Sequence, residues 1–514
     1  MSPSLPLELL LVAGAGGMAL RVALRQPVRR ESQENPGLAL RALTLLLAAF
    51  GLALWAAGQW PLLRQALAAS AGLLAVAAWW RARPDYGRRR RWPPGSLGIG
   101  QSLDAIGQRR FYVEQCQRFG PVFKMSQFGR PVVCILGLER GARLLAEHGH
   151  ALAGATLPHH RLIPRGFLRY MHAETHKAVA PLFRATFSSI ALDQLAPTVR
   201  DCYRRALARL AADSAAGPEG VNARPYLERA VLESLLWLLY GLVPGDPRGE
   251  RLARLIEELQ PGHPGGPGWR RRTRAALTGI AAIMQEIKDG WAAGTAVPPA
   301  ALHSLVESVP EAIENPTYSW NFAMISRIAY GDLTGLNDWL FKMCCDHAWA
   351  LDAVRRGAEA HPPMPPDSES GETDPAVRIV METLRLEQSE FLYRKVARPI
   401  EFEGFVLPRG WLIRLLIQES HRDPAVFSDP DRFDPERFVR RKYTRVEYAP
   451  FGADAHGCMG YRLAHLLGKT LVEELAGYDC RVVSDGPLER GNRHRHHWRP
   501  SANLRVTMTP RATA

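Results

Sequence analysis

Residues 451–460 read FGADAHGCMG and place one cysteine, Cys458, in a glycine-rich loop directly before an apolar helical pattern that runs from Tyr461 to Ala476. A thiolate at the amino terminus of a helix is stabilised by the helix dipole and by unpaired N–H groups, which lower its pKa and let it bind a metal. Gly457 and Gly460 lack a Cβ, so the backbone can turn tightly and a flat ligand can approach it. An isolated cysteine is usually a small buried apolar residue. The surroundings of this one favour a metal-binding thiolate instead.

Three short motifs elsewhere in the chain accompany this loop. Glu382 and Arg385 form an E-x-x-R pair at helical i, i+3 spacing, so the two side chains share one face. Residues 434–438 read DPERF and contain Arg437, and residues 421–424 read HRDP. Each motif alone is weak, because ion pairs at this spacing are common on helix surfaces. Their order and separation along one chain argue against coincidence.

The loop and the motifs resemble those of the cytochrome P-450 family. Phe451, His456, Cys458 and Gly460 match the family's haem loop in register, whereas Asp454 replaces its first glycine. Aspartate is among the few residues that tolerate left-handed backbone geometry, so the turn can survive. The resemblance implies a mainly α-helical fold with a small β part, a haem b cofactor, and Cys458 as the axial thiolate ligand of the haem iron.

The charged residues of the short motifs have a structural role in that family. The resemblance implies that Glu382, Arg385 and Arg437 form a buried network that holds the polypeptide below the haem. Breaking a network of this kind is costly, because it leaves an uncompensated buried charge.

The two haem propionates need cationic or hydrogen-bonding partners. By resemblance these partners are His176, Arg398 and His456, of which His456 would donate to one propionate. The family's arginine four residues after His176 is Ala180 here. Haem anchoring is therefore expected to depend on the two histidines and Arg398.

The family's long central helix carries a glycine, an acid and a threonine over the haem. Gly331 and Thr334 match in register within the helical pattern of residues 320–350. Glycine weakens a helix and threonine bonds back to a carbonyl, so a local bulge is expected there, with Thr334 beside the dioxygen site. Leu333 occupies the place of the acid, and Asp332 is rotated from it by about 100°.

Residues 1–92 are expected to be a membrane anchor of two to three transmembrane helices. Three apolar stretches lie there, Leu9–Leu20, Ala42–Gly58 and Ala66–Trp80, each near or below the length of about 18 to 20 residues that crosses a bilayer. Arginines follow the first and third stretches, so the positive-inside rule places the catalytic domain, residues 93–514, in the cytoplasm. The alternatives are core helices of a soluble domain or, for the first stretch, a signal peptide, which the later apolar stretches disfavour.

The composition excludes several other classes. The 514 residues carry a formal net charge of +14 and seven cysteines without C-x-x-C spacing, which argues against a disulfide framework or a structural zinc site. No basic stripe with interleaved aromatic residues occurs, so no nucleic-acid partner is expected. A hairpin is predicted at residues 121–136 and helices at 197–211 and 226–242. The Arg/His run at 493–497 is expected to be a solvated loop.

The sequence therefore predicts a membrane-anchored haem monooxygenase that inserts one oxygen atom of O2 into a lipophilic small molecule. The electrons would come from a separate reductase or ferredoxin, whose docking Arg440, Arg441 and Lys442 would favour. Two alternatives remain open. One is a haem-thiolate isomerase or dehydratase that acts on a peroxide, which Leu333 favours. The other is a degenerate, non-catalytic haem-binding membrane protein, which Asp454 and Ala180 favour.

Overall fold

The computed structural model describes residues 91–98, 100–127, 130–154, 162–171, 173–259, 268–292, 300–357, 372–387, 392–452, 457–490 and 498–511, together with 58, 60, 61, 63 and 65. Apart from Gly58, the three apolar stretches of the amino-terminal segment lie outside these residues, as do Asp454, His456 and the run at 493–497. None of the described helices is long and apolar enough to cross a membrane.

The chain divides into two compact units, of which the first comprises residues 1–133 with 403–406. Its described elements are α4 (Gly100–Gly107), α5 (Phe111–Phe119), β1 (Val122–Gln127) and the start of β2 (Arg130–Leu136). The two strands are neighbours in a sheet, which confirms the predicted hairpin. Lys124 of β1 is buried and its Nζ donates to the Pro93 carbonyl at 2.7 Å. Gly95 has φ +125°, and a Cβ there would lie 2.1 Å from the Lys124 oxygen, so this contact requires glycine.

The second unit comprises residues 134–402 and 407–514 and is mainly helical. Its helices are α6 (Leu138–His148), η1 (Gly149–Ala151), η3 (Leu168–Tyr170), α7 (Ala173–Ser188), α8 (Leu192–Ser214), α9 (Arg224–Leu235), the π-helix η4 (Leu236–Tyr240), α10 (Pro247–Glu258), α11 (Trp269–Ala292), α12 (Ala301–Ser308), α13 (Pro316–Asp346), α14 (Trp349–Gly357), α15 (Pro375–Leu386), α16 (Ile417–Ser420), α17 (Arg437–Arg440) and α18 (Tyr461–Leu475). Its strands are β3 (Leu152–Gly154), β4 (Val221–Asn222), β5 (Leu392–Val396), β6 (Ile400–Phe402), β8 (Leu412–Leu416), β9 (Tyr478–Ser484), β10 (Glu489–Arg490), β11 (Trp498–Arg499) and β12 (Arg505–Pro510), and β7 (Phe405–Leu407) ends in it.

Besides the antiparallel pair of β10 and β11, two small sets of antiparallel strands accompany these helices. In one, β5 pairs with β3 and with β8, so that Leu152 faces Val396. In the other, β12 lies between β4 and β9. The first sheet brings the end of β5 beside the residues that precede β3.

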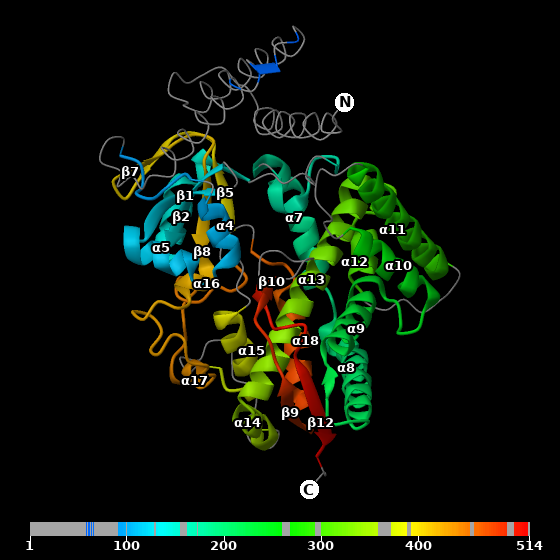
Figure 1. Ribbon diagram of the computed structural model, residues 1–514. Coiled ribbons are helices and arrows are strands. Elements are labelled where there is room, and N and C mark those ends of the chain that lie inside the picture. The colour runs from blue at the N-terminus through cyan, green and yellow to red at the C-terminus, as the bar shows by residue number, and fades with distance from the viewer. Residues whose placement is uncertain are drawn as a thin grey trace. The chain divides into compact units, whose positions relative to one another are not determined.

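Helix α13 is the core of the second unit. Its amino terminus is capped by Asn315, whose side chain accepts from the Thr317 N–H at 2.9 Å. It packs against α9, α15 and α18, and Figure 1 shows it running between α15 on one side and α9 on the other. A Cβ on Gly468 of α18 would lie 3.0 to 3.3 Å from side-chain carbons of Val380 and Leu340. Glycine therefore allows α18 to approach α15 and α13 closely, which fixes the position of the segment that precedes α18.

Two predicted helices end differently in the structure. The helix predicted over 226–242 is α-helical only to Leu235 and continues as a π-helix to Tyr240, because Gly241 follows in left-handed geometry with φ +72°. The helix predicted over 320–350 is α13, which begins at Pro316 and ends at Asp346, before a separate helix starts at Trp349.

The bulge expected near Gly331 is absent, because α13 is continuous through this residue and Thr334. The Thr334 hydroxyl donates to the Gly331 carbonyl at 2.9 Å. This bond is made within the helix and leaves its main-chain course unbroken.

A buried carboxylate, that of Glu382 on α15, binds two arginines, Arg385 of the same helix and Arg437 of α17. Arg385 donates to both Glu382 oxygens at 2.8 Å, and the Arg437 Nε donates to one of them at 3.1 Å. The three side chains are at most 1% exposed. The remaining guanidinium N–H groups bond to main-chain carbonyls, among them those of His421 and Pro430 at 2.7 Å from Arg385. The network thus fixes the course of the irregular segment before α17.

His421 links this network to the cysteine loop by two hydrogen bonds. Its main-chain carbonyl accepts from Arg385, and its Nε2 accepts from the Ala449 N–H at 3.0 Å. The Tyr448 hydroxyl also donates to the Met381 carbonyl at 2.9 Å. The residues just before Phe451 are therefore bonded to α15 both directly and through His421.

We expect Glu382→Gln to lower the free energy of unfolding by about 3–5 kcal/mol, because it leaves two buried guanidinium groups without a counter-charge. Urea unfolding followed by circular dichroism measures the change. Glu286→Gln is the matched control, because Glu286 forms an exposed ion pair with Arg251 at 2.8 Å, and we expect little change there. Equal losses in the two variants would contradict the structural role of the network.

The stability of this region should also fall in acid. Burial, with the nearby positive charge of Arg385, lowers the pKa of His421 to about 3, whereas an unfolded histidine has a pKa of about 6.5. Between these values the unfolded chain binds a proton that the folded chain does not, so stability falls as pH falls, by ~2 kcal/mol between pH 7 and pH 5. His421→Gln keeps an acceptor for the Ala449 N–H and should flatten the pH profile of urea unfolding over this range. Parallel profiles for the two proteins would refute this assignment.

Candidate functional site

Cys458 lies at the end of the glycine-rich loop, three residues before Tyr461, the first residue of α18. Its main-chain N–H donates to the Phe451 carbonyl at 2.9 Å and closes the loop. Gly452 turns the chain with φ +76°. The Cys458 side chain is exposed, and neither it nor any of the other six cysteines forms a disulfide. The loop therefore presents a thiol on its surface, instead of burying it as a packing residue.

The surroundings of this thiol suit an anionic ligand of a metal. Gly460 is the N-cap of α18 and provides no side-chain hydrogen bond to the helix, so the positive end of the helix dipole is not offset by a capping side chain. A Cβ on Gly460 would lie 4.0 Å from the Cys458 Sγ, which is an ordinary van der Waals contact, so the N-cap residue of the helix lies directly beside the sulfur. These features fit a thiolate that binds the iron of a flat macrocycle such as haem.

Phe451 lies at the other end of the same loop and packs against α18. Its ring centroid is 5.5 Å from that of His465 and 6.3 Å from that of Tyr461. Burial lowers the pKa of His465, which keeps its ring uncharged near neutrality. Phe451, at one end of the loop, thus packs against uncharged rings of α18 and not against a positively charged side chain.

Thr334 and Gly331 are buried in the middle of α13. The Thr334 hydroxyl uses its proton in the bond to the Gly331 carbonyl, so a bound group meets its oxygen as an acceptor unless the hydroxyl rotates. Leu333 is buried in the apolar core, and Asp332 is only partly buried. The structure therefore places no carboxylate at position 333, and the roles of Thr334 and Gly331 in handling dioxygen stay predictions.

The predicted propionate partners lie on separate elements. His176 is buried on α7, one turn before the buried Ala180. Arg398 is exposed just after β5, and its Nη2 donates to the His150 carbonyl at 3.1 Å. His456 lies outside the described residues. The assignment of these three residues to the propionates stays a prediction.

Sequence reasoning gave no role to His421, although it lies in the HRDP motif. Its full burial and its bond to Ala449 make it the link between the Glu382 network and the cysteine loop. The only signal in the sequence was its position between the E-x-x-R and DPERF motifs, because a four-residue motif does not show whether its histidine is buried.

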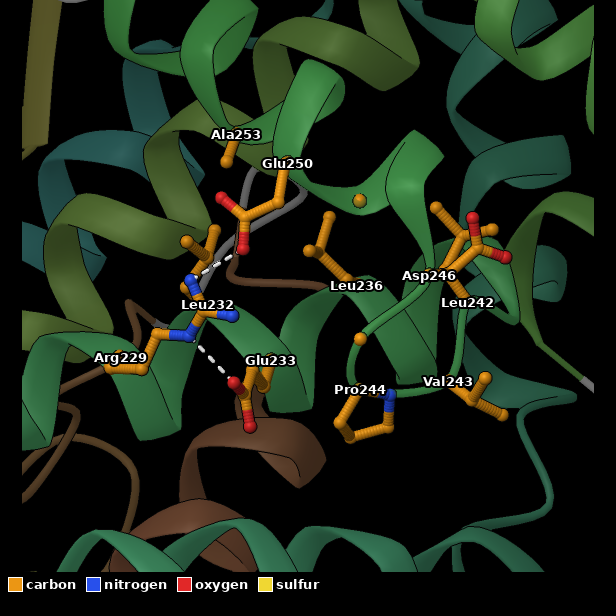
Figure 2. A pocket seen from close by; sticks show the side chains of 12 residues that line it. Arg229, Leu232, Glu233, Leu236, Leu242, Val243, Pro244, Asp246, Glu250 and Ala253 are labelled. Atoms are coloured by element: carbon orange, nitrogen blue, oxygen red, sulfur yellow. Dashed lines mark hydrogen bonds and ion pairs between the residues drawn. The ribbon is translucent and has the colours of Figure 1, made fainter.

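A cavity between α9 and α10 lies among residues unrelated to the cysteine loop. Figure 2 shows Arg229 across it, bonded to Glu233 at 2.6 Å and to Glu250 at 2.7 Å. The third acid of its lining, Asp246, pairs with Arg248 at 2.6 Å, so the charged groups here are already paired and the cavity contributes nothing to the site at the cysteine loop.

Comparison with known proteins identifies the family. The family model of cytochrome P-450 matches residues 376–475, which include Glu382, Arg437 and Cys458. Abscisic acid 8′-hydroxylase 3 of Oryza sativa subsp. indica is 24% identical over 430 residues, which cover 77% of this chain and 83% of that protein. Abscisic acid 8′-hydroxylase 2 of Arabidopsis thaliana is 23% identical over 84% of this chain and 92% of its own length. Cytochrome P-450 26C1 of Homo sapiens is 26% identical over 77% of this chain and 84% of its own length.

A solved structure shares the fold. The retinoic acid bound cyanobacterial CYP120A1 superposes with a TM-score of 0.65 at 20% identity, and the match covers 80% of this chain and 96% of that one. The mainly helical fold with a small β part is thereby confirmed. With the buried Glu382 network, the cysteine loop before α18 and hydroxylases among its relatives, the chain belongs to the cytochrome P-450 superfamily and is an oxidoreductase, a monooxygenase that uses haem b.

Proposed function

We propose that the chain hydroxylates a lipophilic small molecule, with Cys458 as the residue whose thiolate would hold the haem iron. The observation that supports this most is the exposed Cys458 thiol at the amino terminus of α18, on a loop bonded through His421 to the buried network. A loop fixed in this way holds the sulfur at one position without requiring a second ligand to order it.

Each residue of the chain has a limited task in this reaction. Bound haem supplies the activation of dioxygen, and the thiolate of Cys458 tunes it. Burial of Thr334 and Leu333 keeps bulk water away from this part of α13. Thr334 holds a hydroxyl proton at Oγ1, 2.9 Å from the Gly331 carbonyl oxygen. Proton delivery then needs rotation of this hydroxyl, because no acid occupies position 333.

Three considerations support a lipophilic substrate. Two relatives are named as hydroxylases of abscisic acid, and the solved neighbour is named for bound retinoic acid; both compounds are lipophilic. The apolar stretches within residues 1–92 would place the enzyme at a bilayer, with its catalytic domain on the cytoplasmic side, where such substrates concentrate. The chain is proposed to take its substrate from that membrane.

A separate electron donor, a reductase or a ferredoxin, is proposed to dock near Arg440, Arg441 and Lys442. The first two arginines already form ion pairs within their own segment, Arg440 with Asp434 and Arg441 with Glu447. Their charge is therefore partly offset, and the attraction they offer to an acidic donor is weaker than the sequence alone indicates.

We expect Cys458→Ser to abolish the long-wavelength Soret band of the reduced, CO-bound protein, because that band requires a thiolate ligand. Cys480→Ser is the matched control, because Cys480 lies on β9, outside the cysteine loop, and the band should remain. Loss of the band in both variants, or in neither, would contradict the role of Cys458.

Charge reversal of Arg440, Arg441 and Lys442 to glutamate should slow reduction by an acidic donor about tenfold at low salt, since steering of charged partners acts on association rate. Stopped-flow reduction at increasing ionic strength measures the effect, which salt should erase. Arg251→Glu on α10 is the control for a general loss of positive charge. Unchanged rates at low salt would exclude this docking surface.

A further inference from the structure

Helix α13 carries a second polar residue on the face that holds Thr334. Arg327 precedes Thr334 by seven residues, which is a rotation of about 700° and so an offset of only about 20°. The same spacing separates the two positions by about 10 Å along the helix axis. Tyr330, four residues before Thr334, lies between them on this face. Arg327 is therefore two turns from Thr334 on one side of the helix.

Arg327 is partly buried and, unlike the buried arginines of the core, has no hydrogen-bond partner in the described part of the chain. Its Nε is shielded from solvent without a hydrogen bond, and none of its nitrogens bonds or ion-pairs with a residue in the described part of the chain. By contrast, Arg385 donates to Glu382 at 2.8 Å, and the Arg499 Nε donates to Asp338 at 2.9 Å. Arg327 as a whole is only partly buried, so its guanidinium can be reached by a ligand, and leaving its shielded Nε unpaired is costly unless such a ligand bonds it.

The charges around Arg327 limit what that ligand can be. Burial lowers the pKa of its guanidinium, and Asp332 and Tyr170 are the groups that oppose this shift. Arginine stays charged even so. No second cation contributes, and Asp332 adds a negative charge nearby. A single positive charge with a carboxylate nearby favours a monoanion as the ligand. The carboxylate of Asp332 would repel the second negative charge of a phosphate.

Tyr170 belongs to a segment that is fixed against α13. Asn321 of α13 accepts from the Leu168 N–H at 2.7 Å and donates to the Gly166 carbonyl at 3.2 Å. Tyr170 follows within η3 and packs edge-on against Phe167, with 5.6 Å between the ring centroids. An aromatic and apolar wall therefore stands beside the guanidinium, as a substrate with a hydrocarbon body requires.

We propose that Arg327 binds the carboxylate of a lipophilic carboxylic acid substrate, whose hydrocarbon chain extends along α13 toward Thr334. A planar guanidinium bonds a carboxylate through two parallel N–H groups. This inference rests on the proposed function and specifies its substrate class. Because Arg327 and Thr334 are two turns apart, the oxidised carbon lies several bonds from the carboxylate. The expected products are hydroxy acids whose hydroxyl group is far from the carboxylate.

The test compares acids with their methyl esters on the haem-loaded enzyme. Dissociation constants for dodecanoic acid, farnesoic acid and their methyl esters are measured by the substrate-induced Soret shift and by equilibrium dialysis. We expect the wild type to bind each acid about 10- to 100-fold more tightly than its ester, which is the range for a hydrogen-bonded charged group. Arg327→Gln should bring this ratio close to one and leave ester binding unchanged, and Arg327→Lys should keep part of it.

Arg254→Gln is the matched control, because Arg254 is an exposed arginine of α10, and it should retain the wild-type ratio. The reduced CO spectrum of each variant reports whether the haem site is intact. An acid-to-ester ratio that is the same in the wild type and in Arg327→Gln would overturn the proposal, as would a wild type that binds no acid.

The same experiment separates this inference from the proposed function. If the acids bind in an Arg327-dependent way but no electron donor supports oxidation, the hydroxylase assignment fails and the carboxylate site stands. If esters and acids are oxidised equally well in both proteins, the hydroxylase assignment stands and the carboxylate site fails.

Discussion

The carboxylate of Glu382 is the constraint on which the rest of the site depends. It lies where water cannot reach it, so its charge is tolerated only because Arg385 and Arg437 approach from two directions. The two guanidinium groups in turn need more acceptors than one carboxylate offers, and main-chain carbonyls of the irregular segment supply them. A segment without helix or strand is thus held in one conformation by the hydrogen-bonding demand of two buried side chains.

Hydrogen bonds connect this buried network with the loop that carries Cys458. His421 accepts at Nε2 from the Ala449 N–H, and it can do so only while its ring is neutral, which burial ensures. Two residues later Phe451 receives the Cys458 N–H. The close packing of α18 through Gly468 fixes the same loop from its other end. The loop that carries the thiol is therefore positioned from both ends.

Much of this arrangement could be predicted from the sequence because its parts are local or carry fixed side-chain chemistry. The helix after Cys458 and the E-x-x-R pair at 382 and 385 follow from periodicity and spacing. The bulge expected at Gly331 does not form, although Thr334 bonds back to the Gly331 carbonyl as predicted, because α13 stays continuous through both residues. The π-helical end of α9 depends on the left-handed geometry of Gly241, which composition does not specify. Long-range contacts such as that of His421 with Ala449 require the fold itself.

The arginines of the core have two different roles, one in stabilising the fold and one in binding a ligand. Arg385 and Arg437 are neutralised from within, so they contribute to a rigid support and are unavailable to a ligand. Arg327 of the core helix is partly buried, has Asp332 and Tyr170 nearby, and forms no hydrogen bond or ion pair with a residue in the described part of the chain. A carboxylate supplied by the protein would make α13 more stable but would also occupy the group that recognises a substrate anion. When the substrate supplies the counter-charge, the favourable ion pair with Arg327 contributes to the free energy of binding and not to the free energy of folding.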